Sequence, residues 1–483
     1  MRKKGLLFLF FAAFVLLLNL MIPPMQNPDE PQHFAAVMAF AKNVSPVNVP
    51  QSEIISLMDK NRWWHFLGMG RPEPLPEKIA DVSFLMGYNK VSDFTLFLNY
   101  SLIYHFATGK FIGLFAIDHV AWAYYLARLI SIFFFAGALR LFYLSFKRMA
   151  FPSIVPDGFP WLLFGFFFII FLPQFLISSV SVNSDSLSIF LSAIFFFAAF
   201  SLIGQDHQFR MAIILVSSLI TGLIVDRANF FMLPAGLFAI LFSLDRKNIK
   251  KHFLSILLLL AASTLLFFSL KLFFPAQLAK GFNSLRANLP HALSALKSMF
   301  SFDSLDRNFF LDFIDSFLLK FGWSAFSASS IFHIVWRLII AMSCVGIFRY
   351  IVKSLRKRAA DPNHPARLKS YSSNDPTRNS LFLRYGGFSI ATVFFQILAM
   401  RTISTQRTMF AQGRYLFPLI LPIAFLLIIG LKNFFDIFDR KMRLGVRAIK
   451  VMLIFQFLFL NYVIWNEIVP VFHLILKSPH PGG

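Results

Sequence analysis

The sequence has only one cysteine, Cys344, in 483 residues. A single thiol excludes an internal disulfide framework and any metal site that needs several cysteines. Charged residues are also scarce, at 14% of the chain, whereas a soluble protein has about a quarter. The sequence lacks a P-loop, a Gly-rich dinucleotide fingerprint and a D-x-D pair that would hold a metal–diphosphate. These absences argue against a soluble enzyme that binds a nucleotide.

Hydrophobic residues, in contrast, make up 57% of the sequence, and 66 residues are phenylalanine. Several apolar runs reach the roughly 20 residues that a helix needs to cross a bilayer. The sequence therefore predicts an all-α polytopic membrane protein, with a single integral membrane domain over residues 1–483. About eleven spans are predicted, at residues 5–24, 119–146, 160–177, 186–204, 211–225, 228–243, 253–273, 331–352, 381–400, 415–431 and 450–466.

The net charge of +23 predicts the orientation of these spans. If the N-terminus is cytoplasmic and the spans alternate, nearly all of the positive excess falls on the cytoplasmic side, as is usual in membrane proteins. Anionic lipid accounts for this excess, so nucleic acid is not expected as a partner. No cleavage site follows the first run, which should remain as a helix.

The same orientation predicts the nature of the polar segments. Residues 25–118 and 275–330 are expected to be external loops, and residues 353–380 a flexible, basic cytoplasmic linker. Residues 94–117 are expected to include an external helix that lies at the membrane interface. In the second loop, Asp312 and Asp315 alternate with phenylalanines, which predicts an amphipathic helix on the membrane surface.

Four polar clusters then lie at the outer ends of spans, as expected for a site at the outer membrane–water boundary. They are Asp29/Glu30/His33, Asn183/Asp185, Asp226/Arg227 and Gln412 to Tyr415.

The first cluster allows two interpretations. Asp29 followed by Glu30 and Pro31 is typical of a helix N-terminus, with Asp29 as the cap. Alternatively, Asp29 or Glu30 could act as a general base on an acceptor hydroxyl, with His33 on the same helical face to orient it. Asp29 and His33 could also hold a divalent cation, and no other cofactor is expected.

The second and third clusters leave similar alternatives. Asn183 and Asp185 would either cap the helix that begins near residue 186 or line the same external site. Asp226 would either form a local ion pair with Arg227 or support the site.

Arginines in or beside the spans are candidates for binding a phosphate, because a guanidinium matches phosphate oxygens in a bidentate manner. Arg414, beside Tyr415, could do so at the outer edge of its span or could reach toward water. Arg128 lies about ten residues into its span, where a charge usually faces a polar cavity. Arg407 would lie at the opening of the site, and Arg337 also falls within a span.

Four stretches together resemble a bacterial membrane family, domain-of-unknown-function family 2142, which is itself similar to the GT-C glycosyltransferases. The resemblance follows the same order over nearly the whole chain. The stretches are Pro28-Asp-Glu-Pro-Gln-His-Phe34, Ser181-Val-Asn-Ser-Asp185, Phe321-Gly-Trp323 and Gln412-Gly-Arg-Tyr-Leu-Phe-Pro418.

This resemblance implies a GT-C-like fold with external juxtamembrane helices in the first loop. It also implies an inverting transfer of a sugar from a polyprenyl-phosphate donor to a glycan, lipid or protein acceptor of the cell envelope, outside the bacterial inner membrane. By the resemblance, Asp29 is the base, Glu30 is the next candidate and Arg414 binds the lipid phosphate. The chain lacks the soluble C-terminal domain of many GT-C enzymes, so the identities of donor and acceptor do not carry over.

Two other functions remain open. One is a polysaccharide polymerase or ligase that acts on lipid-linked glycans. The other is a non-enzymatic transporter of lipid or glycan. Transporters usually place charges near the membrane midplane and contain internal repeats. Here the acidic residues gather at the outer boundary, which favours the transferase.

Overall fold

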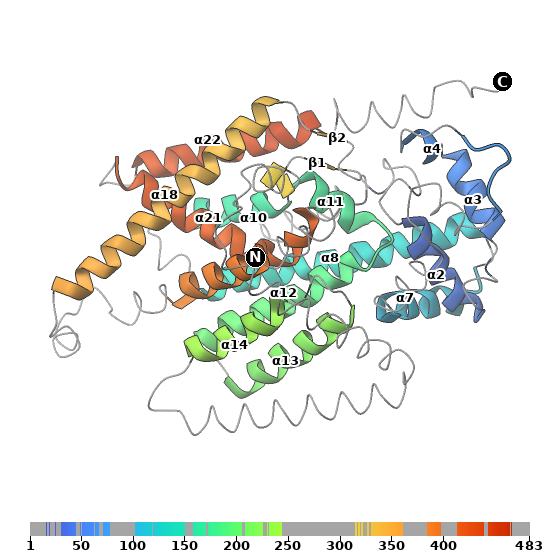
Figure 1. Ribbon diagram of the computed structural model, residues 1–483, viewed down its shortest axis with the longest axis horizontal. Helices are drawn as coiled ribbons and strands as arrows, with labels where there is room; N and C mark the ends of the chain where they lie inside the picture. Colours follow the sequence, from blue (N-terminus) through green and yellow to red (C-terminus); the bar gives the residue numbers. More distant parts are fainter. Residues whose placement is uncertain are drawn as a thin grey trace, which may run out of the picture.

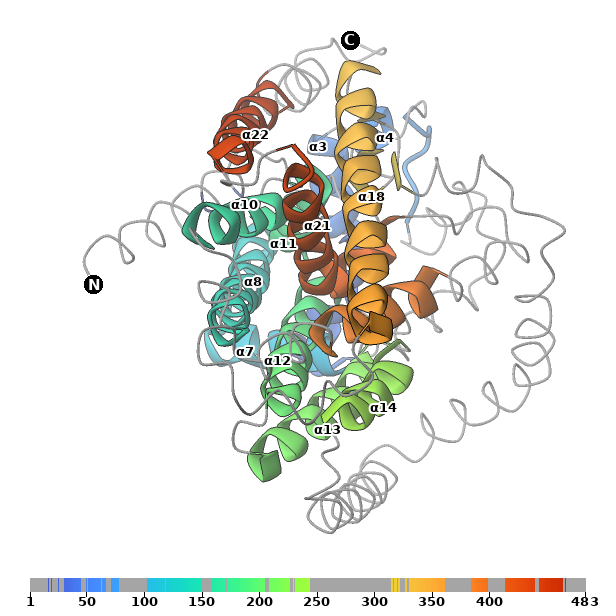
Figure 2. The same cartoon turned by 90° about the vertical axis from the view of Figure 1, so that its left-hand side faces the viewer.

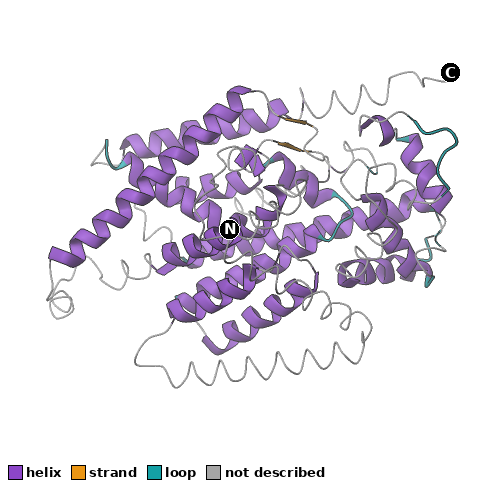
Figure 3. Ribbon diagram, in the orientation of Figure 1, coloured by secondary structure: helices purple, strands orange, loops and turns teal. Residues whose placement is uncertain are grey.

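The fold is known from a computed structural model, shown in Figure 1. It describes residues 16, 19, 25, 30–44, 49, 51–61, 63–66, 71–77, 102–117, 119–149, 158–170, 172–204, 208–225, 229, 231–243, 314–315, 317–318, 320–321, 326–327, 330–360, 384–397, 413–438, 443–463 and 465. Within these residues the chain is helical, apart from one short antiparallel strand pair and a few loops and turns (Figure 3).

A helix at residues 384–397, between α18 and η5, has no label in Figure 1. The labelled ones are α2 (Glu30–Lys42), α3 (Gln51–Lys60), α4 (Trp63–Phe66), α7 (Leu102–Leu114), α8 (Val120–Arg148), α10 (Gly158–Ile170), α11 (Pro173–Val180), α12 (Asp185–Ile203), α13 (Gln208–Val225), α14 (Met232–Ser243), β1 (Lys320–Phe321), β2 (Phe326–Ser327), α18 (Ser330–Ala360), the 3-10 helix η5 (Gly413–Leu419), α21 (Ile420–Phe435) and α22 (Arg443–Tyr462).

Five helical stretches among the described residues are long and apolar enough to cross a membrane. The protein is therefore an α-helical membrane protein. The predicted spans at 211–225 and 228–243 correspond to the shorter helices α13 and α14, whereas span 253–273 and nearly all of span 5–24 lie outside the described residues. The total of about eleven spans stays a prediction. The five stretches are Val120–Arg148, Asp185–Ile203, Ser330–Lys353, Leu416–Phe435 and Gly445–Tyr462.

The predicted span at 160–177 is not one continuous helix. It consists of α10 and α11, with Leu172 in an extended conformation and Pro173 in the first turn of α11. Proline fits the first turn of a helix, and it disfavours a helical conformation in the residue before it. The single proline therefore accounts for the break that the hydropathy pattern did not show.

Contacts at two positions along their lengths show that α8 and α12 run parallel. The rings of Phe134 and Phe190 lie 5.8 Å apart toward one end, and Arg148 donates a hydrogen bond of 2.7 Å to Ser201 at the other. Parallel neighbours require a returning segment between them. The α10–α11 segment supplies it, because Phe175 of α11 packs on Phe135 near the middle of α8, whereas Phe166 of the earlier helix α10 packs on Tyr143, further along α8.

The C-terminal helices repeat this arrangement. Helices α18 and α21 are parallel, since Ser343 bonds to the carbonyl of Leu427 and Arg349 to the carbonyl of Asn433. Helix 384–397 connects them in sequence and runs against α12, with Tyr385 packed on Phe200. In Figure 2 α18 stands directly beside α21. The alternation of spans that the charge pattern predicts stays a prediction, because span 253–273 lies outside the described residues.

The close approach of α18 and α21 depends on two glycines. A Cβ atom added at Gly346 would lie 1.8 Å from the carbonyl oxygen of Gly430, and one added at Gly430 would lie 2.1 Å from Ser343 Oγ. Small residues allow helix backbones to approach closely in membrane proteins, where van der Waals contact drives association. Any side chain at position 346 must push the two helices apart.

We therefore expect Gly346→Ala to reduce the free energy of unfolding by roughly 1–3 kcal/mol, the usual cost of overpacking. The matched control is Gly386→Ala in helix 384–397, where an added Cβ meets nothing within 4 Å. Thermal and denaturant unfolding in detergent would measure both. Equal stability of the two variants would show that the α18–α21 crossing tolerates a side chain.

Four short helices gather near the ends where α8 and α12 begin, which we call the motif end. Figure 1 shows α2, α3, α4 and α7 together at the right, beside the start of α8. Helix α7 packs on α2 through Gly109 and Gly113, since a Cβ at Gly109 would lie 2.5 Å from the carbonyl of Val37. Two glycines four residues apart therefore allow α7 to lie directly against α2. Neither α2 nor α7, at 13 residues each, is long enough to cross a bilayer.

Candidate functional site

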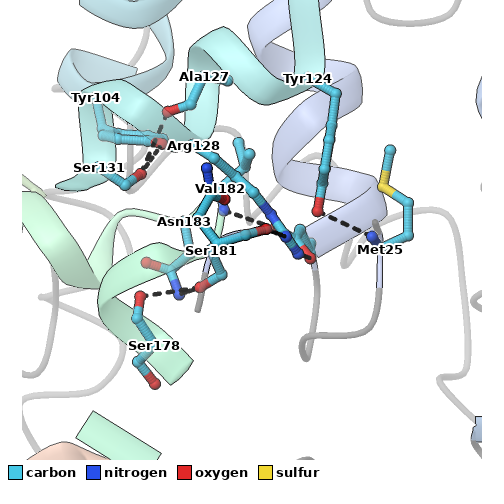
Figure 4. Close-up of polar contacts among 12 residues, drawn as sticks. Met25, Tyr104, Tyr124, Ala127, Arg128, Ser131, Ser178, Ser181, Val182 and Asn183 are labelled. Atoms are coloured by element: carbon cyan, nitrogen blue, oxygen red, sulfur yellow. Dashed lines mark hydrogen bonds and ion pairs between the residues drawn. The ribbon is translucent and has the colours of Figure 1, made fainter. Parts of the chain in front are cut away.

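An ion pair between Glu30 and Arg128 lies at the centre of the motif end. Arg128 Nε and Nη2 donate hydrogen bonds of 3.1 and 3.2 Å to the two carboxylate oxygens of Glu30. Both side chains have an exposed fraction of 0%. The Glu30 carboxylate also accepts a hydrogen bond of 2.8 Å from the backbone N–H of Val182. One carboxylate thus joins the first turn of α2, the α8 span and the turn before α12. Figure 4 shows Arg128 of α8 next to Val182 of that turn.

The segment before α2 is bonded to the same part of α8. Arg128 Nη1 donates to the carbonyl of Asn19, at 3.3 Å, and the guanidinium lies over the Tyr124 ring, 4.7 Å from its centroid. The Tyr124 hydroxyl in turn accepts a 2.9 Å hydrogen bond from the backbone N–H of Met25. Met25 has a φ of 64°, which is uncommon for a residue with a side chain. These contacts fix the chain on both sides of the stretch that contains Asp29.

The turn before α12 is held by its own side chains. Asn183 Oδ1 accepts a hydrogen bond of 3.3 Å from the N–H of Ser186, and Asn183 Nδ2 donates one of 2.7 Å to Ser181 Oγ. The Asn183 side chain therefore bonds to the first turn of α12, whose N-cap residue is Ser184. These bonds also fix the turn that presents the Val182 N–H to Glu30. Asp185 follows in the first turn of α12 and is half-buried.

His33, one turn into α2, contacts a second histidine. Its Nδ1 lies 2.8 Å from Nε2 of His105 on α7, and both side chains are buried. Next to His105, the Tyr104 hydroxyl shares a 2.7 Å hydrogen bond with Ser131 of α8. Burial raises the pKa of Tyr104, so this hydroxyl stays neutral. The described residues contain no group of three or more metal-ligating side chains.

A second charged cluster joins the predicted second external loop to α18. Arg337 donates to both carboxylate oxygens of Asp315, at 3.2 and 2.5 Å, and His333 Nδ1 lies 3.2 Å from the same carboxylate. The sequence pattern predicted that Asp315 would lie on an amphipathic helix at the membrane surface. In the structure Asp315 is instead buried against α18. Burial alone would raise the pKa of Asp315, but the hydrogen bonds and charges of Arg337 and His333 lower it overall. The ionised Asp315 carboxylate therefore stabilises the fold at neutral pH. This stabilisation is lost as the pH falls through the lowered pKa of Asp315.

The remaining predicted site residues are only partly described. Asp29, Asp226 and Arg407 lie outside the described residues, and for Arg414 and Tyr415 the structure describes the backbone of η5 but not the side chains. Helix η5 contacts α11 and α12, and its Phe417 packs on Phe175 of α11.

Sequence reasoning missed two partners of the predicted residues. It singled out Glu30 and Arg128 separately, as a second base and a phosphate ligand, but it did not pair them. It also did not predict that His105 would bond to His33. A buried arginine in a span is a signal that an acid should lie nearby, but spacing along the chain does not identify which acid.

Comparisons with known proteins identified no relative of this chain. No protein-family description, no curated protein and no solved structure matches the chain. The function is therefore argued from the residues, their contacts and the resemblance of the four sequence stretches.

Proposed function

We propose that the protein is a membrane glycosyltransferase of the GT-C type. It would move a sugar from a polyprenyl-phosphate donor to a glycan, lipid or protein acceptor, on the extracytoplasmic side of the bacterial inner membrane. The observation that supports it most is the bonding of Glu30 to both Arg128 and Val182. This contact joins two of the predicted polar clusters, the one that begins with Asp29 and the one that ends with Asp185.

The paired carboxylate supports a division of roles between the two adjacent acids. Glu30 is buried and accepts hydrogen bonds from a guanidinium and a backbone N–H. A carboxylate that is fully buried and already accepts these bonds has no exposed oxygen to offer to an acceptor hydroxyl. In the proposal, Glu30 and Arg128 anchor the first turn of α2, and Asp29 acts as the base.

The reaction proceeds as an inverting displacement. The acceptor hydroxyl gives its proton to the Asp29 carboxylate while its oxygen forms a bond to the anomeric carbon of the sugar. The bond between that carbon and the phosphate oxygen breaks, and polyprenyl phosphate leaves as the anion. Arg414 and Arg407 stabilise the negative charge that develops on the phosphate, and each such donor is worth about 3–4 kcal/mol.

The test uses the purified protein in nanodiscs with radiolabelled polyprenyl-phosphate sugars and a cell-envelope glycan extract. Nucleotide sugars serve as control donors. Transfer of one label per acceptor from a polyprenyl-phosphate sugar alone would support the proposal. A ladder of repeat lengths would indicate a polymerase or ligase, and donor binding without transfer would indicate a transporter.

A further inference from the structure

Gln456 is a buried amide within the membrane-spanning stretch Gly445–Tyr462 of α22. It lies on the same helical face as Ile449 and Val463, seven residues before and after it, and all three side chains have an exposed fraction of 0%. No described residue forms a hydrogen bond with Gln456 Oε1 or Nε2. An amide that is removed from water needs hydrogen-bond partners, so an unbonded glutamine inside a span points to a bound polar molecule.

A second unbonded group lies at the same level, on α18. The Trp336 ring packs on Phe455 and Phe459 of α22, with ring centroids 6.5 and 6.3 Å away. Gln456 lies between these two phenylalanines along α22. The Trp336 side chain is buried, and its Nε1–H has no acceptor among the described residues. One donor on α18 and one amide on α22 therefore lie at the same depth.

The end of α10 lies beside the same tryptophan. Phe168 of α10 packs on Trp336, with ring centroids 5.5 Å apart. Helix α10 ends at Ile170, and the last four carbonyls of a helix have no partner within it. Pro173, the first residue of α11, has no N–H to donate to the buried Ile169 carbonyl four residues earlier. In membranes, neighbouring side chains and ordered water bond the carbonyls that an interrupted helix leaves free.

We propose that Gln456, Trp336 and the carbonyl end of α10 bind ordered water inside the membrane-spanning part of the protein. Water accepts from the Trp336 indole N–H and the Gln456 amide N–H, and it donates to Gln456 Oε1 and to a carbonyl at the end of α10. Every unbonded group of the site then has a partner, and buried waters typically make about three such bonds. This inference does not depend on the proposed glycosyltransferase function.

The indole N–H signals of the purified protein in nanodiscs test the proposal directly. With ¹⁵N-labelled tryptophan, the variant Trp336→Phe identifies the Trp336 signal. In wild type this N–H should show a cross-peak at the water frequency, and Gln456→Met, which removes the polar atoms and nearly keeps the size of the side chain, should abolish it. Trp161 of α10, which packs near Gly445, is the internal control, and Gln456→Met should leave its signal unchanged. A Trp336 signal without a water cross-peak in wild type, or with one to lipid protons instead, would overturn the proposal.

Thermal unfolding of single and double variants is an independent test. Gln456→Met and Trp336→Phe should each lower the melting temperature by roughly 2–4 °C. Because both side chains bind the same water, the double variant should lose less than the sum of the two single variants. Gln456→Met combined with Trp161→Phe is the matched control, and its losses should add. Additive losses for Gln456 and Trp336, or a Gln456→Met variant that melts above wild type, would contradict a shared water.

Discussion

Replacing Asp29 by asparagine is expected to abolish sugar transfer and to leave the melting temperature unchanged. Asparagine has the shape of aspartate but cannot accept a proton, and a positioned general base typically contributes a factor of about 10²–10⁴ in rate. Single-turnover transfer from the preferred polyprenyl-phosphate sugar, compared with wild type in the same nanodiscs, would measure the loss.

This substitution also separates the two interpretations of Asp29. Asparagine caps a helix about as well as aspartate does, so a residue that only caps α2 would tolerate it in both stability and activity. Asp29→Ala removes the cap as well as the base and should cost a further 0.5–2 kcal/mol or so in the free energy of unfolding. Full transfer by the asparagine variant would mean that another group accepts the proton, with Glu30 and Asp185 the predicted alternatives.

Breaking the Glu30–Arg128 pair is expected to be the most damaging change to stability. Glu30→Gln leaves the Arg128 charge buried and uncompensated, and loss of one partner from such a pair costs about 3–5 kcal/mol. The double variant Glu30→Gln with Arg128→Met removes both charges, so most of that loss should be recovered. Denaturant unfolding of the two single variants and the double variant would measure the coupling between the two side chains.

The same variants test the phosphate role that the sequence suggested for Arg128. If Arg128 binds the donor phosphate rather than anchoring α2, then Arg128→Met should unfold like wild type and fail to retain the donor lipid. Arg140→Met is the control, because it removes a positive charge from the same helix and leaves the Glu30–Arg128 pair intact. Wild-type stability of Arg128→Met would contradict the anchor.

The sequence allowed much of the helical architecture to be predicted, because long apolar runs and loop charges reflect the membrane directly. The parallel directions of α8 and α12, and of α18 and α21, come from contacts such as Arg148–Ser201 and Arg349–Asn433. The break before Pro173 was missed because hydropathy averages over a window and does not register the restriction that one proline places on the residue before it.

The site was harder to predict than the spans. The motif in α2 was identifiable from its composition, as was the unusual depth of Arg128. The pairing of Glu30 with Arg128 was not identifiable, because it depends on how α2 packs on α7 and α8 after folding. The same holds for His105, whose importance comes only from its distance to His33.

The anchor of α2 also sets an order for the biogenesis of the protein. Glu30 is separated from Arg128 by 98 positions and from Val182 by 152 positions. At roughly 5–20 residues per second, the ribosome adds Val182 on the order of ten to thirty seconds after Glu30. During that interval Glu30, which follows the first apolar run, does not yet have both of its partners, Arg128 and Val182. The motif end therefore assembles only after α12 has begun to be made, however early α2 itself is synthesised.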